Sequence, residues 1–244
     1  MKHWIRAAAL LLPLALLSAC LFQPGKFEST LTVHKDRSFT FTYKGEVVAL
    51  DLEGMNGLPG MSAGDAAATD GSTPDNTAAA EEEQTPEQKA AAKAAKDEEY
   101  RELAANLAKE YGYRTVEYRG DGVFYVDYAI SGVLTHEFVY PYNQDAAMIF
   151  PWVTVELRGG DTLKIKAPGY AKQDMSGMGA AGGGSGGDMP SKTQGSFTLI
   201  TDAEIVSQNN ENGAAKQGAN SVVVWRVTPR TTDAPMAVLR VAAR

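Results

Sequence analysis

Alternation of apolar and polar residues is the feature that most constrains how this chain can fold. It marks Phe27–His34 and Ser38–Lys44 near the start, and it recurs in segments between Tyr113 and Val241. Successive side chains of a β-strand point to opposite faces, so each segment predicts a strand with one face on a core. The short connections Lys35-Asp36-Arg37 and Gly120-Asp121-Gly122 predict hairpins between antiparallel strands.

Ten strands are expected in all, with Gly45–Leu52 as a continuation of the second. They are Phe27–His34, Ser38–Lys44, Tyr113–Arg119, Val123–Ile130, Val133–Pro141, Ala147–Arg158, Thr162–Ala167, Ser196–Gln208, Ser221–Pro229 and Met236–Val241. Pro151 inside the sixth of them predicts a bulge or an edge position.

One helix stands out among these strands. Thr85 and Gln88 fit a capping box around Pro86 at the first helical position, and Gly112 is placed to end the helix. The first half is rich in alanine and charged residues, whereas the second half is amphipathic. Its predicted buried face consists of Tyr100, Leu103, Ala104, Leu107, Ala108 and Tyr111.

Strands around one amphipathic helix predict an α+β fold, a twisted antiparallel sheet with the helix packed on one face. Two stretches poor in large apolar side chains interrupt it: residues 55–84 are predicted to be a disordered insertion and residues 174–195 a Gly-rich disordered linker. The remaining parts, residues 20–54, 85–173 and 196–244, are expected to form one domain, with the leading hairpin beside the last strands.

The N-terminus has the layout of a secretory signal. Lys2, His3 and Arg6 precede the apolar run Ala7–Leu17, which is too short to span a bilayer, and small residues follow it. Leu17-Ser18-Ala19-Cys20 resembles the lipobox of bacterial lipoproteins. The alternative is a cleaved secretory signal whose cysteine is incidental.

The lipobox resemblance implies that residues 1–19 are a signal peptide, that cleavage falls between Ala19 and Cys20, and that Cys20 carries diacylglycerol. Acylation of the new amino group usually follows, and two or more chains give stable anchoring without a transmembrane helix. Leu21 stands where enteric lipoproteins retained in the inner membrane have aspartate. In a Gram-negative cell this favours the periplasmic face of the outer membrane.

The charge of the chain bounds its partners. The net charge of −7 becomes −9 once Lys2 and Arg6 leave with the signal, so nucleic acid is not an expected partner. Cys20 is the single cysteine, so no internal disulfide is available. The expected partners are the membrane, through the anchor, and a lipid, a glycan or an envelope protein.

Histidines offer little for catalysis. His136 is expected on one strand face with Leu134, Phe138 and Tyr140, where it is read as a packing or hydrogen-bonding residue, and His34 is expected to face solvent. No sequence motif of a hydrolase or a metal site occurs. We therefore expect no enzyme activity, no catalytic residues and no cofactor; the alternative is a lipid-anchored hydrolase with His136 as base and an unidentified partner.

Oxygen-rich side chains gather at Asp202, Glu204 and the segment Asn209–Gly213. Weak calcium binding is the functional alternative there, because calcium takes six to eight oxygen ligands. The spacing does not match an EF-hand, and Asn212-Gly213 is typical of a tight turn, so we expect a turn and no metal site.

Aromatic residues are concentrated in the middle strands. They are Phe124, Tyr125, Tyr128, Phe138, Tyr140, Tyr142, Phe150 and Trp152. Aromatic side chains on both faces of one strand indicate either a covered sheet, the favoured reading, or an apolar groove for a lipid or a partner chain.

Both ends of the chain resemble the LppM-like domain of bacterial envelope lipoproteins. The similar segments are 196–213, with a stretch like "G-x-I-x-x-x-N", the strand Ser221–Pro229 with Val224-Trp225-Arg226, and the opening strands in residues 25–47. The resemblance implies an envelope lipoprotein and supplies no catalytic residues. Together with the lipobox it predicts a membrane-anchored lipoprotein acting as a binding or structural module.

Overall fold

The computed structural model describes residues 21–50, 85–141, 151–172 and 192–243. The predicted signal peptide, Cys20 and most of the two predicted insertions lie outside these ranges. The predictions made for them therefore stay predictions.

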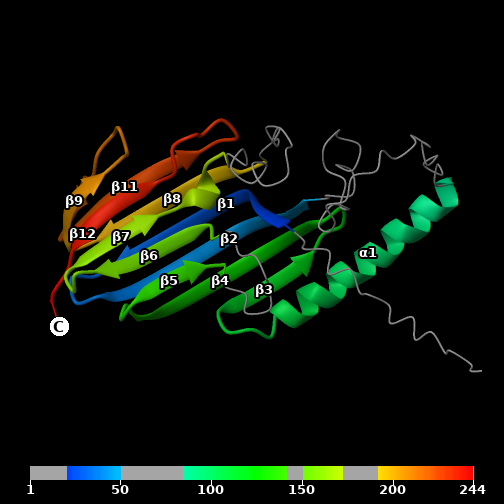
Figure 1. The fold of residues 1–244 in the computed structure, drawn as a ribbon, viewed down its shortest axis with the longest axis horizontal. Coiled ribbons are helices and arrows are strands. Elements are labelled where there is room, and N and C mark those ends of the chain that lie inside the picture. The colour runs from blue at the N-terminus through cyan, green and yellow to red at the C-terminus, as the bar shows by residue number, and fades with distance from the viewer. Residues whose placement is uncertain (1–20, 51–84, 142–150, 173–191, 244) are drawn as a thin grey trace, which may run out of the picture.

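The described strands form two sheets, so the fold is mostly β with one helix (Figure 1). The seven-stranded sheet has the order β10-β11-β8-β1-β2-β4-β3, and the five-stranded sheet has the order β5-β6-β7-β12-β9. The strand bounds are β1 Leu21–Val33, β2 Ser38–Leu50, β3 Tyr113–Tyr118, β4 Val123–Val133, β5 Glu137–Tyr140, β6 Val153–Arg158, β7 Thr162–Lys166, β8 Gln194–Thr201, β9 Glu204–Gln208, β10 Ala215–Gln217, β11 Asn220–Val227 and β12 Met236–Arg240.

Where the two sheets lie over one another, the apolar side of the strand alternation faces the other sheet. In β2, Phe39, Phe41 and Tyr43 are buried, and in the smaller sheet Val153, Val155, Leu163, Ile165 and Leu239 are completely buried. Aromatic contacts join the layers, for example between Phe41 and Tyr140, whose ring centres are 4.9 Å apart. The two sheets therefore share one hydrophobic core.

The predicted single antiparallel sheet is wrong in two respects. The strands divide into two sheets, and β1 pairs with β8 in parallel, with Phe27 opposite Gly195 and Val33 opposite Thr201. The leading hairpin does lie beside the late strands, as predicted. A second sheet forms because the buried residues of β5, β6, β7 and β12 need a partner surface, which the inner face of the larger sheet supplies.

The predicted strand Ser196–Gln208 is two strands in different sheets. β8 ends at Thr201 in the larger sheet, and β9 begins at Glu204 in the smaller one. The Thr201 hydroxyl accepts a hydrogen bond from the backbone N–H of Ala203 at 3.0 Å, which stabilises the turn between them. The apolar residues continue through the corner because both strands face the same core.

Helix α1, Pro86–Leu107, begins as the sequence predicts. The Thr85 side chain accepts from the Gln88 backbone N–H, and the Gln88 side chain accepts from the Thr85 N–H at 2.8 Å, which completes the capping box. The helix ends at Leu107 rather than running to Gly112. Gly112 instead lies against the ring of Tyr128 with a φ of +95°, so its lack of a side chain serves a close approach.

The predicted buried face of α1 is shorter than expected. Tyr100 and Ala104 are buried, whereas Tyr111, beyond the helix end, is 79% exposed. Tyr100 packs on Phe124, with ring centres 5.4 Å apart, and Tyr128, on the same face of β4, packs on Tyr140 of the smaller sheet at 4.8 Å. The helix and the smaller sheet thus cover adjacent parts of one face of the larger sheet.

The N-terminal half of α1 lies beyond this contact. Residues 85–95 are exposed, and Figure 1 shows this part of the helix extending past the end of the sheets. The helix runs antiparallel to β3, because the Tyr113 N–H donates to Glu110 O at the helix end while Lys93 pairs with Asp121 after β3.

Candidate functional site

A group of five tyrosines, here called the tyrosine cluster, lies in and against the hydrophobic core. It consists of Tyr43, Tyr113, Tyr128, Tyr140 and Tyr170, which come from β2, β3, β4, β5 and the 3-10 turn η2, Pro168–Tyr170. Ring centres are 5.5 Å apart between Tyr43 and Tyr140 and 4.9 Å apart between Tyr113 and Tyr128. The cluster bridges the two sheets at the level of η2.

Hydrogen bonding inside the cluster is sparse. The Tyr43 hydroxyl donates to the backbone oxygen of Glu46 at 2.7 Å. The hydroxyls of Tyr170 and Ser29 are both buried, and neither makes a hydrogen bond of ordinary geometry with a described residue. The Ser29 hydroxyl lowers the pKa of Tyr170, against the larger effect of burial, which raises it.

Burial governs the ionisation of these tyrosines. It raises the pKa of Tyr170 and raises the pKa of Tyr43 and Tyr140 well above the ordinary tyrosine value. Burial also raises the pKa of Tyr128, and that of Tyr113 to about 12, with smaller contributions from neighbouring side chains. The hydroxyls therefore remain neutral at physiological pH, and no phenolate is available as a nucleophile or base.

The predicted aromatic residues mostly belong to this core. Phe124, Tyr128, Phe138, Tyr140 and Trp152 are buried. Tyr125, on the other face of β4, lies under the guanidinium of Arg119, 4.3 Å from the ring centre. Tyr142 and Phe150 lie outside the described residues. For the described residues, the prediction of a covered sheet accounts for the positions of these aromatic side chains.

His136 lies outside the core, contrary to the strand face predicted for it. Leu134, Phe138 and Tyr140 are buried, but His136 is exposed because β5 begins only at Glu137 and the alternation does not extend back to it. Its Nδ1 lies 3.4 Å from the hydroxyl of Thr135. Among the described residues, no carboxylate contacts His136, so this geometry does not form a catalytic dyad.

His34 is partly exposed, in line with its predicted position at a strand end. Its Nδ1 lies 3.6 Å from a carboxylate oxygen of Asp202, and 44% of its side chain is exposed. The same oxygen accepts the backbone N–H of Lys35 at 2.7 Å. Asp202 therefore links the first hairpin to the corner between β8 and β9.

Asn209, one of the oxygen-rich residues, is occupied by hydrogen bonds within the protein. Its side-chain oxygen accepts from the indole N–H of Trp225 at 3.0 Å and from the Met236 backbone N–H at 2.9 Å. Its amide nitrogen donates to Ala234 O at 2.8 Å. One side chain thus ties the end of β9 to β11 and to the start of β12.

The rest of this segment is a turn, as predicted. The Asn210 side chain accepts from the Asn212 backbone N–H at 2.9 Å, and Gly213 has a φ of +71°. Among the described residues, no group of three or more His, Cys, Asp or Glu side chains is arranged to hold a metal ion.

Arg37 is a structural residue that sequence reasoning missed. It lies in the hairpin between β1 and β2 with a φ of +73°, yet it is only 4% exposed. Its Nε donates to Ala242 O at 2.8 Å, and its Nη2 donates to Gly160 O at 2.5 Å. A basic residue in a short turn gives no signal for such a role, because the carbonyl groups that it binds are distant in sequence.

Comparison with known proteins gives structural likeness but no sequence family. No protein-family model matches the sequence, and no curated protein matches it. Over the part that the structure describes, no helix has both the length and the apolar character needed to span a membrane. The solved structures include the folded domain of LppM from Mycobacterium tuberculosis, determined by NMR, which is similar over 91% of this chain and 94% of that chain, with 18% identity and a TM-score of 0.32.

Proposed function

We propose that this chain is a lipoprotein of the bacterial cell envelope, anchored through Cys20, and that its β-sandwich is a non-enzymatic binding or structural module. One observation carries the proposal. The lipobox-like sequence Leu17-Ser18-Ala19-Cys20 follows a charged and apolar leader, and it ends one residue before β1 begins at Leu21. The first described strand therefore begins directly after the cysteine that a mature lipoprotein would carry at its N-terminus.

Two features of the described residues support a module without catalysis. Packed aromatic and aliphatic side chains fill the space between the sheets, and the tyrosine hydroxyls there are held neutral by burial. His136, the base of the alternative hydrolase, is exposed, and its Nδ1 lies 3.4 Å from the Thr135 hydroxyl rather than beside a carboxylate of a described residue. The partner of the module is a lipid, a glycan or an envelope protein, and in a Gram-negative cell the module faces the periplasm from the outer membrane.

The anchor is tested by cell fractionation of Cys20→Ala, with labelled palmitate as a second readout. The variant should lose the label and leave the membrane fraction, because a retained signal is too short to span the bilayer. Leu21→Asp is the matched variant and should keep the label. In enteric bacteria it should move the protein from the outer to the inner membrane. Some molecules of Cys20→Ala will have had the signal peptide removed. If these molecules still sediment with the membrane, the proposed lipid anchor is wrong.

The module is tested by assaying purified protein against ester, peptide and glycoside substrates, with His136→Ala alongside. We expect no turnover that depends on His136. Activity that is lost in His136→Ala but kept in His34→Ala would overturn the non-enzymatic proposal in favour of the hydrolase.

A further inference from the structure

The two ends of the sandwich lie at different distances from the proposed anchor. β1 begins at Leu21, so one peptide bond joins Cys20 to the sheet, and about 3.8 Å separates the Cα atoms of Cys20 and Leu21. β1 has 13 residues and at about 3.3 Å per residue it spans about 40 Å before the hairpin at His34–Arg37. No spacer lies between the anchor and the first strand.

Three segments meet at the anchor end of the larger sheet. Leu21 pairs with Leu50 at the end of β2. The Ala49 backbone N–H donates to Gly122 O at 2.8 Å, which places the turn between β3 and β4 at the same end. Lys93 of α1 forms an ion pair with Asp121 of that turn, with 2.5 Å between Nζ and Oδ1.

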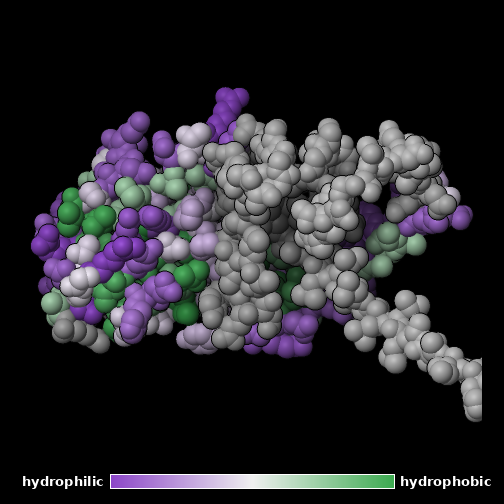
Figure 2. Space-filling model, in the orientation of Figure 1, coloured by the Kyte–Doolittle hydropathy of each residue, from purple (hydrophilic) through white to green (hydrophobic). Residues whose placement is uncertain are grey.

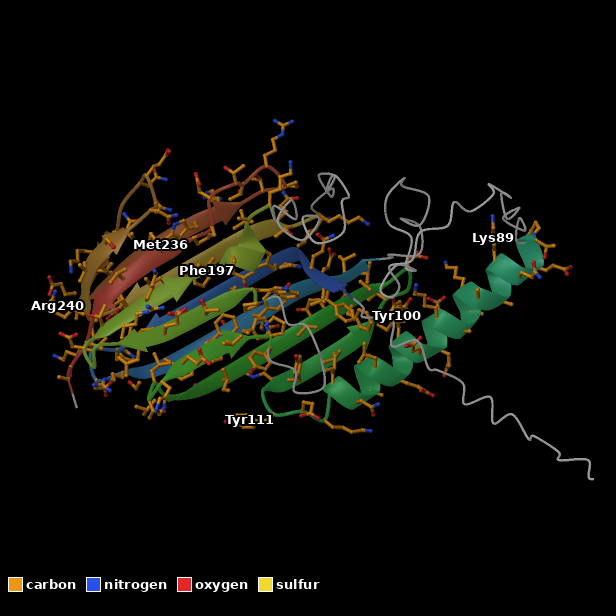
Figure 3. The ribbon with its side chains drawn as sticks, in the orientation of Figure 1. Lys89, Tyr100, Tyr111, Phe197, Met236 and Arg240 are labelled. Atoms are coloured by element: carbon orange, nitrogen blue, oxygen red, sulfur yellow. The ribbon has the colours of Figure 1, made fainter. Side chains whose placement is uncertain are left out.

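Helix α1 continues past this end. Residues 86–92 precede the contact at Lys93, and at about 1.5 Å per residue they extend about 10 Å beyond it. Figure 3 labels Lys89 in this part of the helix, clear of the sheets, whereas Tyr100 lies at the sheet end. A bilayer at the level of Cys20 would therefore meet this part of the helix before any other described element.

We propose that the N-terminal half of α1, Pro86–Lys96, lies in the headgroup layer of the membrane and fixes the domain with the His34–Arg37 hairpin pointing away from the bilayer. This inference rests on the proposed lipid anchor. The binding partner of this exposed helical segment is thus the lipid surface itself.

The composition of the segment suits that surface. It carries Lys89, Lys93 and Lys96 and the single acid Glu87, in a chain whose net charge is −7, and Lys93 also pairs with Asp121, which leaves Lys89 as the lysine nearest the free end of the helix. Its other residues are mainly alanines, and Figure 2 shows hydrophilic and weakly hydrophobic residues at this end. Lysine side chains can reach lipid phosphates while a small apolar helix face rests at the interface.

The test uses the lipidated full chain in vesicles of phosphatidylethanolamine and phosphatidylglycerol. Cys20 is consumed by the lipid, so a new cysteine at one position can carry an environment-sensitive fluorophore. The positions are Ala91→Cys in the exposed helix segment and Lys35→Cys in the distant hairpin, both exposed. Headgroup spin-labelled lipid should quench most of the fluorescence at position 91 and leave that at position 35 unchanged.

A charge variant gives an independent readout. Lys89→Glu should reduce quenching at position 91, whereas Lys109→Glu, at the other end of the helix, should leave it unchanged. Equal quenching at positions 91 and 35, or none at position 91 in protein that floats with the vesicles, would overturn the orientation and leave the anchor standing. Protein that does not float with the vesicles would overturn both.

Discussion

Trp225 donates its indole N–H to the side-chain oxygen of Asn209, and Asn209 also accepts the backbone N–H of Met236. The contact joins the larger sheet, through β11, to the smaller sheet, through β9 and β12. Asn209→Ala leaves three groups without their partner, so it should lower the free energy of unfolding by about 2 kcal/mol.

Urea denaturation followed by Trp fluorescence measures this effect. Asn212→Ala is the control, because Asn212 takes part in the neighbouring turn through its backbone N–H, which the substitution keeps. It should change the stability by less than about 0.5 kcal/mol. An equal loss in the two variants would show that the turn, rather than the Asn209 bonds, sets the stability.

The raised pKa values of the buried tyrosines predict alkaline unfolding. Above the ordinary tyrosine pKa of about 10, the unfolded chain releases protons that the folded chain keeps, so stability falls as pH rises. Tyr43, Tyr140 and Tyr170 together should lower the free energy of unfolding by about 4 kcal/mol per pH unit between that value and their raised pKa values.

Absorbance of phenolate at 295 nm and circular dichroism check this prediction. The buried tyrosines should ionise together with the loss of structure. Ionisation of all tyrosines near pH 10 with the fold intact would be inconsistent with the buried cluster.

Tyr100 should contribute much of the free energy that holds α1 against the larger sheet. It is 5% exposed and packs on both Tyr118 and Phe124. Tyr100→Ala should lower the free energy of unfolding by about 3 kcal/mol, as expected for a large buried side chain. Tyr111→Ala is the matched control at 79% exposure and should be nearly neutral. Denaturant titration of the two variants gives the comparison.

Gly112 combines a φ of +95° with a close neighbour, since a Cβ there would lie 2.5 Å from Cε2 of Tyr128. Gly112→Ala should therefore cost about 3 kcal/mol, from backbone strain and from displacement of the Tyr128 ring. Gly213 has a φ of +71°, and a Cβ built there has nothing within 4 Å. Gly213→Ala therefore measures the backbone strain alone, which should cost about 1 kcal/mol. Thermal melting should rank the two variants in that order, and equal losses would refute the close contact.

Local patterns in the sequence predicted most of the elements. The capping box located the start of α1, and the alternation located most strands, because these signals depend on residues near one another in the chain. The division into two sheets depends on packing between distant segments. Ser196–Gln208 shows the difference: its apolar residues are correctly assigned to the core, but the alternation does not show that the chain changes sheets at Ala203.

The candidate residues show the same limit. Local alternation predicts a buried strand face for His136, but β5 begins only at Glu137, one residue later, and the buried role of Arg37 depends on Gly160 and Ala242, far along the chain. Cys20 is predicted as a lipidation site because the lipobox-like segment is a contiguous signal. Its lipidation stays a prediction, because it lies outside the described residues.

The parallel pairing of β1 with β8 also determines when the larger sheet can be completed during synthesis of the chain. β1 is the middle strand of the larger sheet, and one of its two neighbours is made only when residues 194–201 have been synthesised. The first hairpin therefore keeps the backbone groups on the β1 edge unpaired while more than half of the chain is produced. Its maturation is coupled to the completion of the polypeptide, so premature termination before β8 would yield an aggregation-prone product and not a smaller stable domain.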